Sequence, residues 1–164
     1  MTKEKDIEFL SIIDEYINHP KVQELKNCTH HGIDRLDHCR RVAYYTYKVT
    51  KRLHLNVYSA TKAAMLHDFF SDELKDRSKL RSFRLHPNVA VENAKKYFTL
   101  TPMEEDIIKT HMFPVTFTPP KYLESWIVDL VDDVVSVYER LSSAREESHS
   151  LANIVALIFL SILR

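Results

Sequence analysis

Apolar residues recur at intervals of three and four along most of the chain, which is the period of a helix that buries one face. This pattern predicts a first helix over residues 4–17, a long helix over 35–53 and another long helix over 122–146. On the helix over 122–146, the apolar residues expected on the inner side are Trp126, Leu130, Val134, Val137 and Leu141. The whole chain is interpreted as helices joined by two longer loops, without internal repeats, so the predicted fold class is all-α.

Helix start and stop signals divide the first half of the chain further. Proline fits the first position of a helix, so Pro20 is expected to begin a short helix over 20–25. Residues 27–34 form a predicted loop, and Asp34 at its end is the expected N-cap of the long helix that follows. Ser59 is the expected N-cap of the next helix, which should end near Phe69.

The second half of the chain begins with a charge-rich stretch. Residues 70–85 are predicted to be a solvated loop, long enough to act as a lid. His86 and Pro87 are expected to open a helix, with the proline at its first position. Thr101 starts a capping-box motif, which predicts a helix ending at His111.

A short apolar segment follows the last long helix. Residues 150–163 are almost wholly apolar, and a membrane span needs about 20 such residues, so we expect no span here. The segment is interpreted as a helix in the centre of the core or, less favoured, as a contact in a homodimer.

Length, charge and cysteine content limit the possible functions. The 164 residues fit a single domain over 1–164. Basic and acidic residues number 23 each, so no net charge draws the protein to extended nucleic acid or to a membrane surface. Two cysteines and a charged N-terminus, which lacks the apolar core of a secretion signal, are typical of a cytoplasmic protein.

Glycine is almost absent from the chain. Gly32 is the only one, and phosphate-cradling loops need several glycines for tight turns and close backbone approach. Any phosphate must therefore be bound by metal ions, by Arg, Lys or His side chains, or by helix ends.

The candidate chemistry lies in imidazoles and carboxylates spread over the predicted helices. Nitrogen and oxygen ligands of this kind hold zinc, iron and manganese. Asp68 ends an apolar stretch and Asp132 lies among valines and leucines, where an unpaired carboxylate would be costly. The candidate metal ligands are His38, His67, Asp68, His86, His111 and Asp132.

Three segments together resemble the HD superfamily of metal-dependent phosphohydrolases. Residues 37–43 (Asp-His-Cys-Arg-Arg-Val-Ala) resemble the helix of the first His, and residues 63–68 (Ala-Ala-Met-Leu-His-Asp) resemble the helix of the His-Asp pair. Residues 127–139 resemble the late helix, with Asp132 in the ligand position. The resemblance covers about residues 30–140 and implies a single HD-type bundle of about seven or eight helices.

The two additional histidines, His86 and His111, are similar to those of the two-metal branch of the superfamily. That branch includes hydrolases of diadenosine tetraphosphate and some cyclic-dinucleotide phosphodiesterases. The resemblance implies a first ion on His38, His67, Asp68 and Asp132, with Asp68 bridging to a second ion on His86 and His111. Mixed nitrogen and carboxylate ligands suit iron or manganese, and zinc is possible.

The expected function is hydrolysis of a nucleotide or another small phosphorylated metabolite by a metal-activated hydroxide. His67 and Asp68 are the expected catalytic residues, and Arg35, Arg41 and Lys75 are the expected substrate-binding residues. Three alternatives remain open: a non-catalytic nucleotide and metal sensor, a helical domain whose metal only stabilises the fold, and a di-iron oxygenase.

Overall fold

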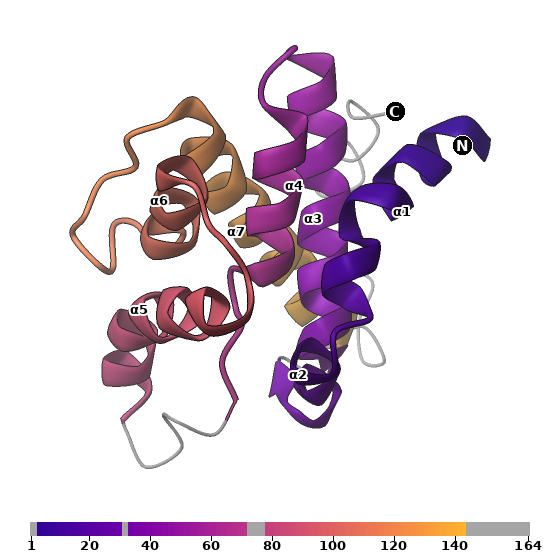
Figure 1. Ribbon diagram of the computed structural model, residues 1–164. Coiled ribbons are helices and arrows are strands. Elements are labelled where there is room, and N and C mark those ends of the chain that lie inside the picture. Colours follow the sequence, from indigo (N-terminus) through magenta and orange to yellow (C-terminus); the bar gives the residue numbers. More distant parts are fainter. Residues whose placement is uncertain (1–2, 31–32, 72–77, 144–164) are drawn as a thin grey trace.

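The computed structural model describes residues 3–30, 33–71 and 78–143, and within them it confirms the predicted all-α class (Figure 1). No helix in these ranges is long and apolar enough to cross a membrane. The predicted helix over 150–163 lies outside the described residues. The elements are α1 (Lys3–Ile17), α2 (Pro20–Gln23), the 3₁₀ helix η1 (Glu24–Asn27), β1 (Thr29–His30), β2 (Ile33–Asp34), α3 (Arg35–Arg52), α4 (Val57–Leu66), α5 (Lys79–Tyr97), α6 (Pro102–Thr110) and α7 (Leu123–Ser143).

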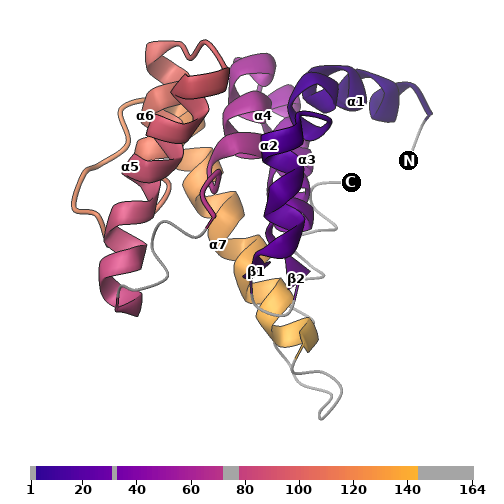
Figure 2. The same cartoon turned by 60° about the horizontal axis from the view of Figure 1, so that its bottom comes forward.

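Helices α3 and α4 form the centre of the bundle (Figure 1). Ala43 on α3 and Ala63 and Ala64 on α4 are fully buried, and such small side chains let the helix backbones approach closely. Helix α1 packs on α4 from one side, and α6 packs on α4 and α7 from the other, with α5 against α6 (Figure 2). Helix α4 therefore lies between α1, α3, α6 and α7 and contacts all four.

The predicted helix caps are confirmed at two positions and wrong at a third. The Asp34 side chain caps α3, and Thr101 forms the complete capping box of α6. The predicted N-cap Ser59 lies inside α4, because the helix begins at Val57. Asn56 is the N-cap instead, and its side chain accepts the Ser59 N–H at 3.1 Å. The predicted loop at 27–34 contains the short antiparallel pair β1–β2.

Helix α5 begins well before the predicted start at His86. It starts at Lys79, so the end of the predicted loop at 70–85 is helical and Pro87 lies inside the helix. Arg81 and Arg84 are exposed whereas His86 and Pro87 are buried. Arg81 and Arg84, two of the charges that indicated a loop, therefore lie on the solvent face of an amphipathic helix, whereas the charged residues at 72–77 lie outside the described residues.

The predicted inner face of α7 is wrong. Trp126, Leu130 and Val137 are 44%, 55% and 51% exposed. The helix instead buries the side that carries Asp132, and the apolar residues of that side are Ile127, Val128, Val131 and Val135. Because the apolar residues of α7 occupy two faces, apolar spacing alone could not select the buried one.

Candidate metal centre

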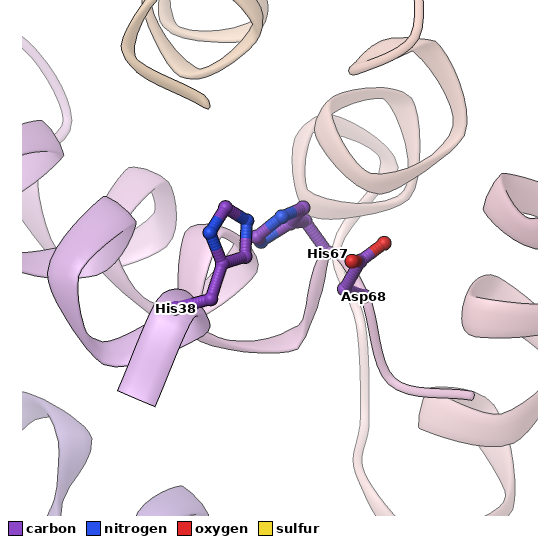
Figure 3. A group of neighbouring side chains, drawn as sticks. All are labelled: His38, His67 and Asp68. Atoms are coloured by element: carbon purple, nitrogen blue, oxygen red, sulfur yellow. The ribbon is translucent and has the colours of Figure 1, made fainter. Parts of the chain in front are cut away.

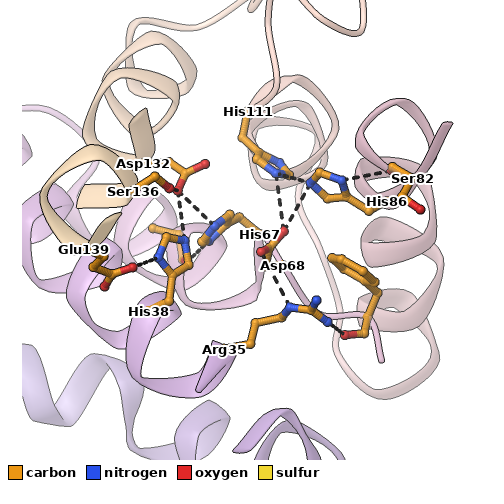
Figure 4. Close-up of polar contacts among 12 residues, drawn as sticks. Arg35, His38, His67, Asp68, Ser82, His86, His111, Asp132, Ser136 and Glu139 are labelled. Atoms are coloured by element: carbon orange, nitrogen blue, oxygen red, sulfur yellow. Dashed lines mark hydrogen bonds and ion pairs between the residues drawn. The ribbon is translucent and has the colours of Figure 1, made fainter. Parts of the chain in front are cut away.

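All six predicted ligands are buried, and they converge on one region of the interior from five different elements (Figure 4). His67 and Asp68 were expected in the last turn of α4, but the helix ends at Leu66, so His67 is its C-cap and Asp68 follows. In Figure 3, His38 and His67 lie close together, with a ring-centroid distance of 5.3 Å, and Asp68 lies beside them. His86 lies inside α5, His111 is the C-cap of α6, and Asp132 lies in the middle of α7.

Each of the four imidazoles is anchored through Nδ1. In His67, His86 and His111 this nitrogen lies 2.7, 3.2 and 2.7 Å from the carbonyl oxygen of Ala64, Ser82 and Ile108, respectively. In His38 it lies 2.8 Å from Oε2 of Glu139. A carbonyl or carboxylate oxygen accepts, so Nδ1 carries the proton, and Nε2 is left as the ligand atom.

His38, His67 and Asp132 form the first part of the centre. The Oδ1 atom of Asp132 lies 2.9 Å from Nε2 of His38 and 3.6 Å from Nε2 of His67. Nε2 of His67 is buried without a hydrogen-bond partner among the described residues. A buried nitrogen left in this way is costly in a folded protein, and a bound cation would satisfy it.

Asp68, His86 and His111 form the second part. The Nε2 atoms of the two histidines are only 2.9 Å apart, and Oδ1 of Asp68 lies 3.2 Å from the first and 3.6 Å from the second. Ligand atoms around one ion at bonds of about 2.1 Å are separated by about 3.0–3.4 Å. This group therefore has the spacing of a metal site.

The two parts of the centre are connected. The candidate ligands form three overlapping groups, and inside each group the ligand atoms lie within 4.8 Å of one another. The groups are His38–His67–Asp68, His67–His111–Asp132 and Asp68–His86–His111. Asp68 occurs in the first and third groups, which is the position expected of a residue shared between two ions. The residues present therefore fit a centre for divalent metal ions.

The imidazoles determine the charge of the buried carboxylates. Burial alone would raise the pKa of Asp68, but His86, His111 and His67 outweigh it and hold this pKa well below its usual value. Burial likewise opposes ionisation of Asp132, yet His67 and His38 lower its pKa well below the usual value. Both carboxylates are therefore ionised at neutral pH and available to a cation.

Protons compete with a cation at the first part of the centre more than at the second. Burial lowers the pKa of His38, but hydrogen bonds to Asp132 and Glu139 override it and raise the pKa to about 10. The pKa of His67 is also raised, against burial, by Cys39 and Asp132. Burial lowers the pKa of His111. A cation must therefore displace protons from His38 and His67 at neutral pH.

Glu139 is the site residue that the sequence reasoning missed. It is fully buried in α7, seven residues after Asp132, and so lies two turns further along the same helix face. Its Oε2 atom accepts the Nδ1–H of His38, and its Oε1 atom lies 3.4 Å from the guanidinium of Arg41. A carboxylate behind a ligand histidine fixes the orientation of the ring and increases its basicity.

Of the three predicted substrate-binding residues, Arg35 and Arg41 lie beside the centre, and Lys75 lies outside the described residues. The guanidinium of Arg35 is stacked 3.8 Å from the ring centre of Phe70 and donates to the Phe70 carbonyl. Phe70 in turn stacks on His86 at 5.0 Å. The Nε atom of Arg35 lies 3.8 Å from Oδ2 of Asp68, and this Nε–H makes no hydrogen bond in the described part of the chain.

Another carboxylate, Asp129, lies near the centre but in none of the three ligand groups. It is buried one turn before Asp132 on α7, and its Oδ1 atom accepts the backbone N–H of Phe113 at 3.1 Å. Burial and the neighbouring charge of Asp133 raise the pKa of Asp129 to about 7.

Comparison with known proteins agrees with this arrangement. No curated protein and no solved structure matches the chain. The model of the HD domain family matches residues 35–136, which is more than half of the chain and includes all six candidate ligands. The chain therefore belongs to the HD domain family.

Proposed function

We propose that this protein is a metal-dependent phosphohydrolase that works with two divalent ions. One ion would be held by His38, His67 and Asp132, the other by His86 and His111, with Asp68 shared between them. The observation that carries the proposal is the convergence of four Nε2 atoms and two ionised carboxylates in one buried cluster. Iron and manganese suit this mixed ligand set, and zinc is a further candidate.

The two ions would supply activation of water and a positive field for the oxygens of a phosphoryl group. Asp68 would orient both ions, and His67 would hold the first ion next to it. Arg35 supports the proposal because its buried Nε–H lies at the edge of the centre, beside Asp68. That donor would bind a phosphate oxygen, and Arg41 and Lys75 would neutralise further charge.

We propose a nucleotide or another small phosphorylated metabolite as the substrate. A cavity of about 160 Å³ adjoins the segment that directly follows Asp68. Phe69 and Phe70 line it together with Asn93, Lys96 and the ion pair of Lys21 with Glu24. Aromatic rings beside ammonium groups suit a compound that combines a planar base with phosphate.

The experiment has two steps, metal analysis and a substrate screen. Protein purified without chelators is analysed for bound metals and is then tested with iron, manganese or zinc against nucleotides and phosphorylated metabolites. We expect close to two ions per chain and phosphate release from at least one compound class. In Asp68→Asn, activity should fall to background and the metal content by at least one ion. Asp37→Asn, which changes a partly exposed carboxylate next to His38, is the matched control and should keep both.

Two results would contradict the proposal. Undiminished activity in Asp68→Asn would remove the shared carboxylate from the mechanism. Metal binding without turnover of any compound would favour the alternative of a non-catalytic sensor, and nucleotide binding to the metal-loaded protein would then identify it.

A further inference from the structure

The outer face of α7 carries a row of apolar side chains, which we call the α7 stripe: Leu130, Val134, Val137 and Leu141. Leu130 and Val137 are 55% and 51% exposed, and the other two are half-buried. Successive members are four, three and four residues apart, so at about 100° per residue they fall within about 60° of the helix circumference. A row of this kind on one helix face is typical of a surface that packs against another helix.

The chain itself contains a segment that matches the α7 stripe. This segment comprises residues 150–164, which lie outside the described residues. On a helix, their polar side chains would fall within about 80° of the circumference, with Leu157 the only apolar residue among them. The polar residues are Ser150, Asn153, Ser161 and Arg164. A second side of the helix, centred about 130° from the polar one, would carry Leu151, Val155, Ile158 and Ile162, again four, three and four residues apart.

The two rows match in an antiparallel direction. Leu130 would lie opposite Ile162, and Val134 opposite Ile158. Val137 and Leu141 would lie opposite Val155 and Leu151, so that all four pairs share one register. The register leaves residues 144–149 for the turn, and apart from Ala144 these are polar or charged. Such a turn is close to the length found in hairpins of two antiparallel helices.

We propose that residues 150–163 fold back as a helix and cover the α7 stripe, forming a hairpin with α7. The tether favours this occupant over a second copy of the chain, because a segment joined by a short turn has an effective concentration in the millimolar range. The hairpin would brace the half of α7 that holds Asp132 and Glu139, on the side opposite the metal centre.

Disulfide trapping in the full chain tests the register. The partly exposed Cys28 is replaced by serine, and the buried Cys39 is left in place. One variant carries Val134→Cys with Ile158→Cys, which the hairpin makes neighbours. The matched control carries Val134→Cys with Leu157→Cys, where the second position would point away from α7. Under mild oxidation we expect the first pair to close within one chain at least tenfold faster than the control, as read by peptide mapping.

Equal rates for the two pairs, or disulfides that form mainly between chains, would overturn the proposal. The second result would assign the α7 stripe to contact with another copy of the chain.

Melting curves provide a test that does not depend on cysteine chemistry. Ile158→Lys should lower Tm by about 5 °C or more, because it places a charge in the packed face, whereas Leu157→Lys should leave Tm nearly unchanged. Equal Tm values for the two variants would also refute the hairpin.

Discussion

The carboxylate behind His38 allows a quantitative test of the metal centre. Glu139→Gln keeps the size of the side chain, and its amide oxygen can still accept the Nδ1–H of His38, so that mainly the negative charge is lost. Hydrogen bonds to charged groups contribute about 1.5–3 kcal/mol and neutral ones about 0.5–1.5 kcal/mol, which leaves a difference of roughly 1–1.5 kcal/mol. That difference corresponds to about a tenfold loss of affinity for the ion bound by His38.

The pH dependence follows from the same contact. Glu139 also stabilises the imidazolium form of His38, whose pKa is raised to about 10. Below about pH 10, a proton on His38 competes with the metal ion. The substitution weakens the binding of that proton too, and this offsets part of the lost affinity for the ion. The loss should therefore be smallest near neutral pH and should grow toward pH 10, where it should approach about tenfold, the lower end of the 10–100-fold range known for residues behind metal ligands.

The assay is a titration of metal-free protein with manganese or zinc against a chromogenic chelator at several pH values. We expect Glu139→Gln to weaken one binding step and to leave the step at His86 and His111 nearly unchanged. Ser136→Ala is the control, because the hydrogen bond from Ser136 to Asp132 is long, at 3.4 Å, and its loss should change the affinity by less than about twofold. Wild-type affinity in Glu139→Gln, or equal weakening of both steps, would refute the assigned role.

Three further predictions concern stability. The pKa of Asp129 is about 7 in the folded protein against the usual 3.8, so ionisation of this carboxyl destabilises the fold as the pH rises through this interval. Asp129→Asn should therefore raise Tm by about 3 °C at pH 8 but not at pH 4, as measured by differential scanning fluorimetry. Lys62→Met should lower the free energy of unfolding by about 3 kcal/mol in urea titrations, because it removes the ammonium group that lies 2.9 Å from the buried carboxylate of Glu104 and neutralises it. A loss below 1 kcal/mol would count against this role of the ion pair. Asn56→Ala should cost about 1 kcal/mol in the same titrations, whereas Ser59→Ala should cost clearly less, and the reverse order would restore Ser59 as the cap of α4.

The buried cluster of candidate ligands could be predicted because each of these residues stands out chemically from its surroundings. An ionisable side chain such as Asp132 within an apolar helical pattern requires a partner, and only a few histidines occur in comparable positions. Glu139 could not be found in this way, because glutamate near the end of a helix usually faces solvent. Its spacing of seven residues from Asp132 was the available signal, since it places both residues on one helix face.

The errors in the helices have a common physical origin. Charged residues before His86 and the proline after it both indicate a helix start when read locally, yet tertiary packing extends α5 back to Lys79. On α7 two apolar faces compete, and the buried one is the face from which Asp132 reaches the centre. Starting from the required ligand, rather than from the apolar spacing, would have selected Val128 and Val135 as the inner residues.

The anchoring of His67, His86 and His111 to carbonyl oxygens three or four residues earlier in the chain bears on how the protein acquires its metal. Each ring is oriented by its own helical segment and does not depend on an ion to hold it. The site is thus preorganised, and ion uptake should require dehydration and proton release but no rearrangement of the bundle. Reconstitution of the metal-free protein should accordingly be limited by ion entry, with rates that rise in proportion to metal concentration.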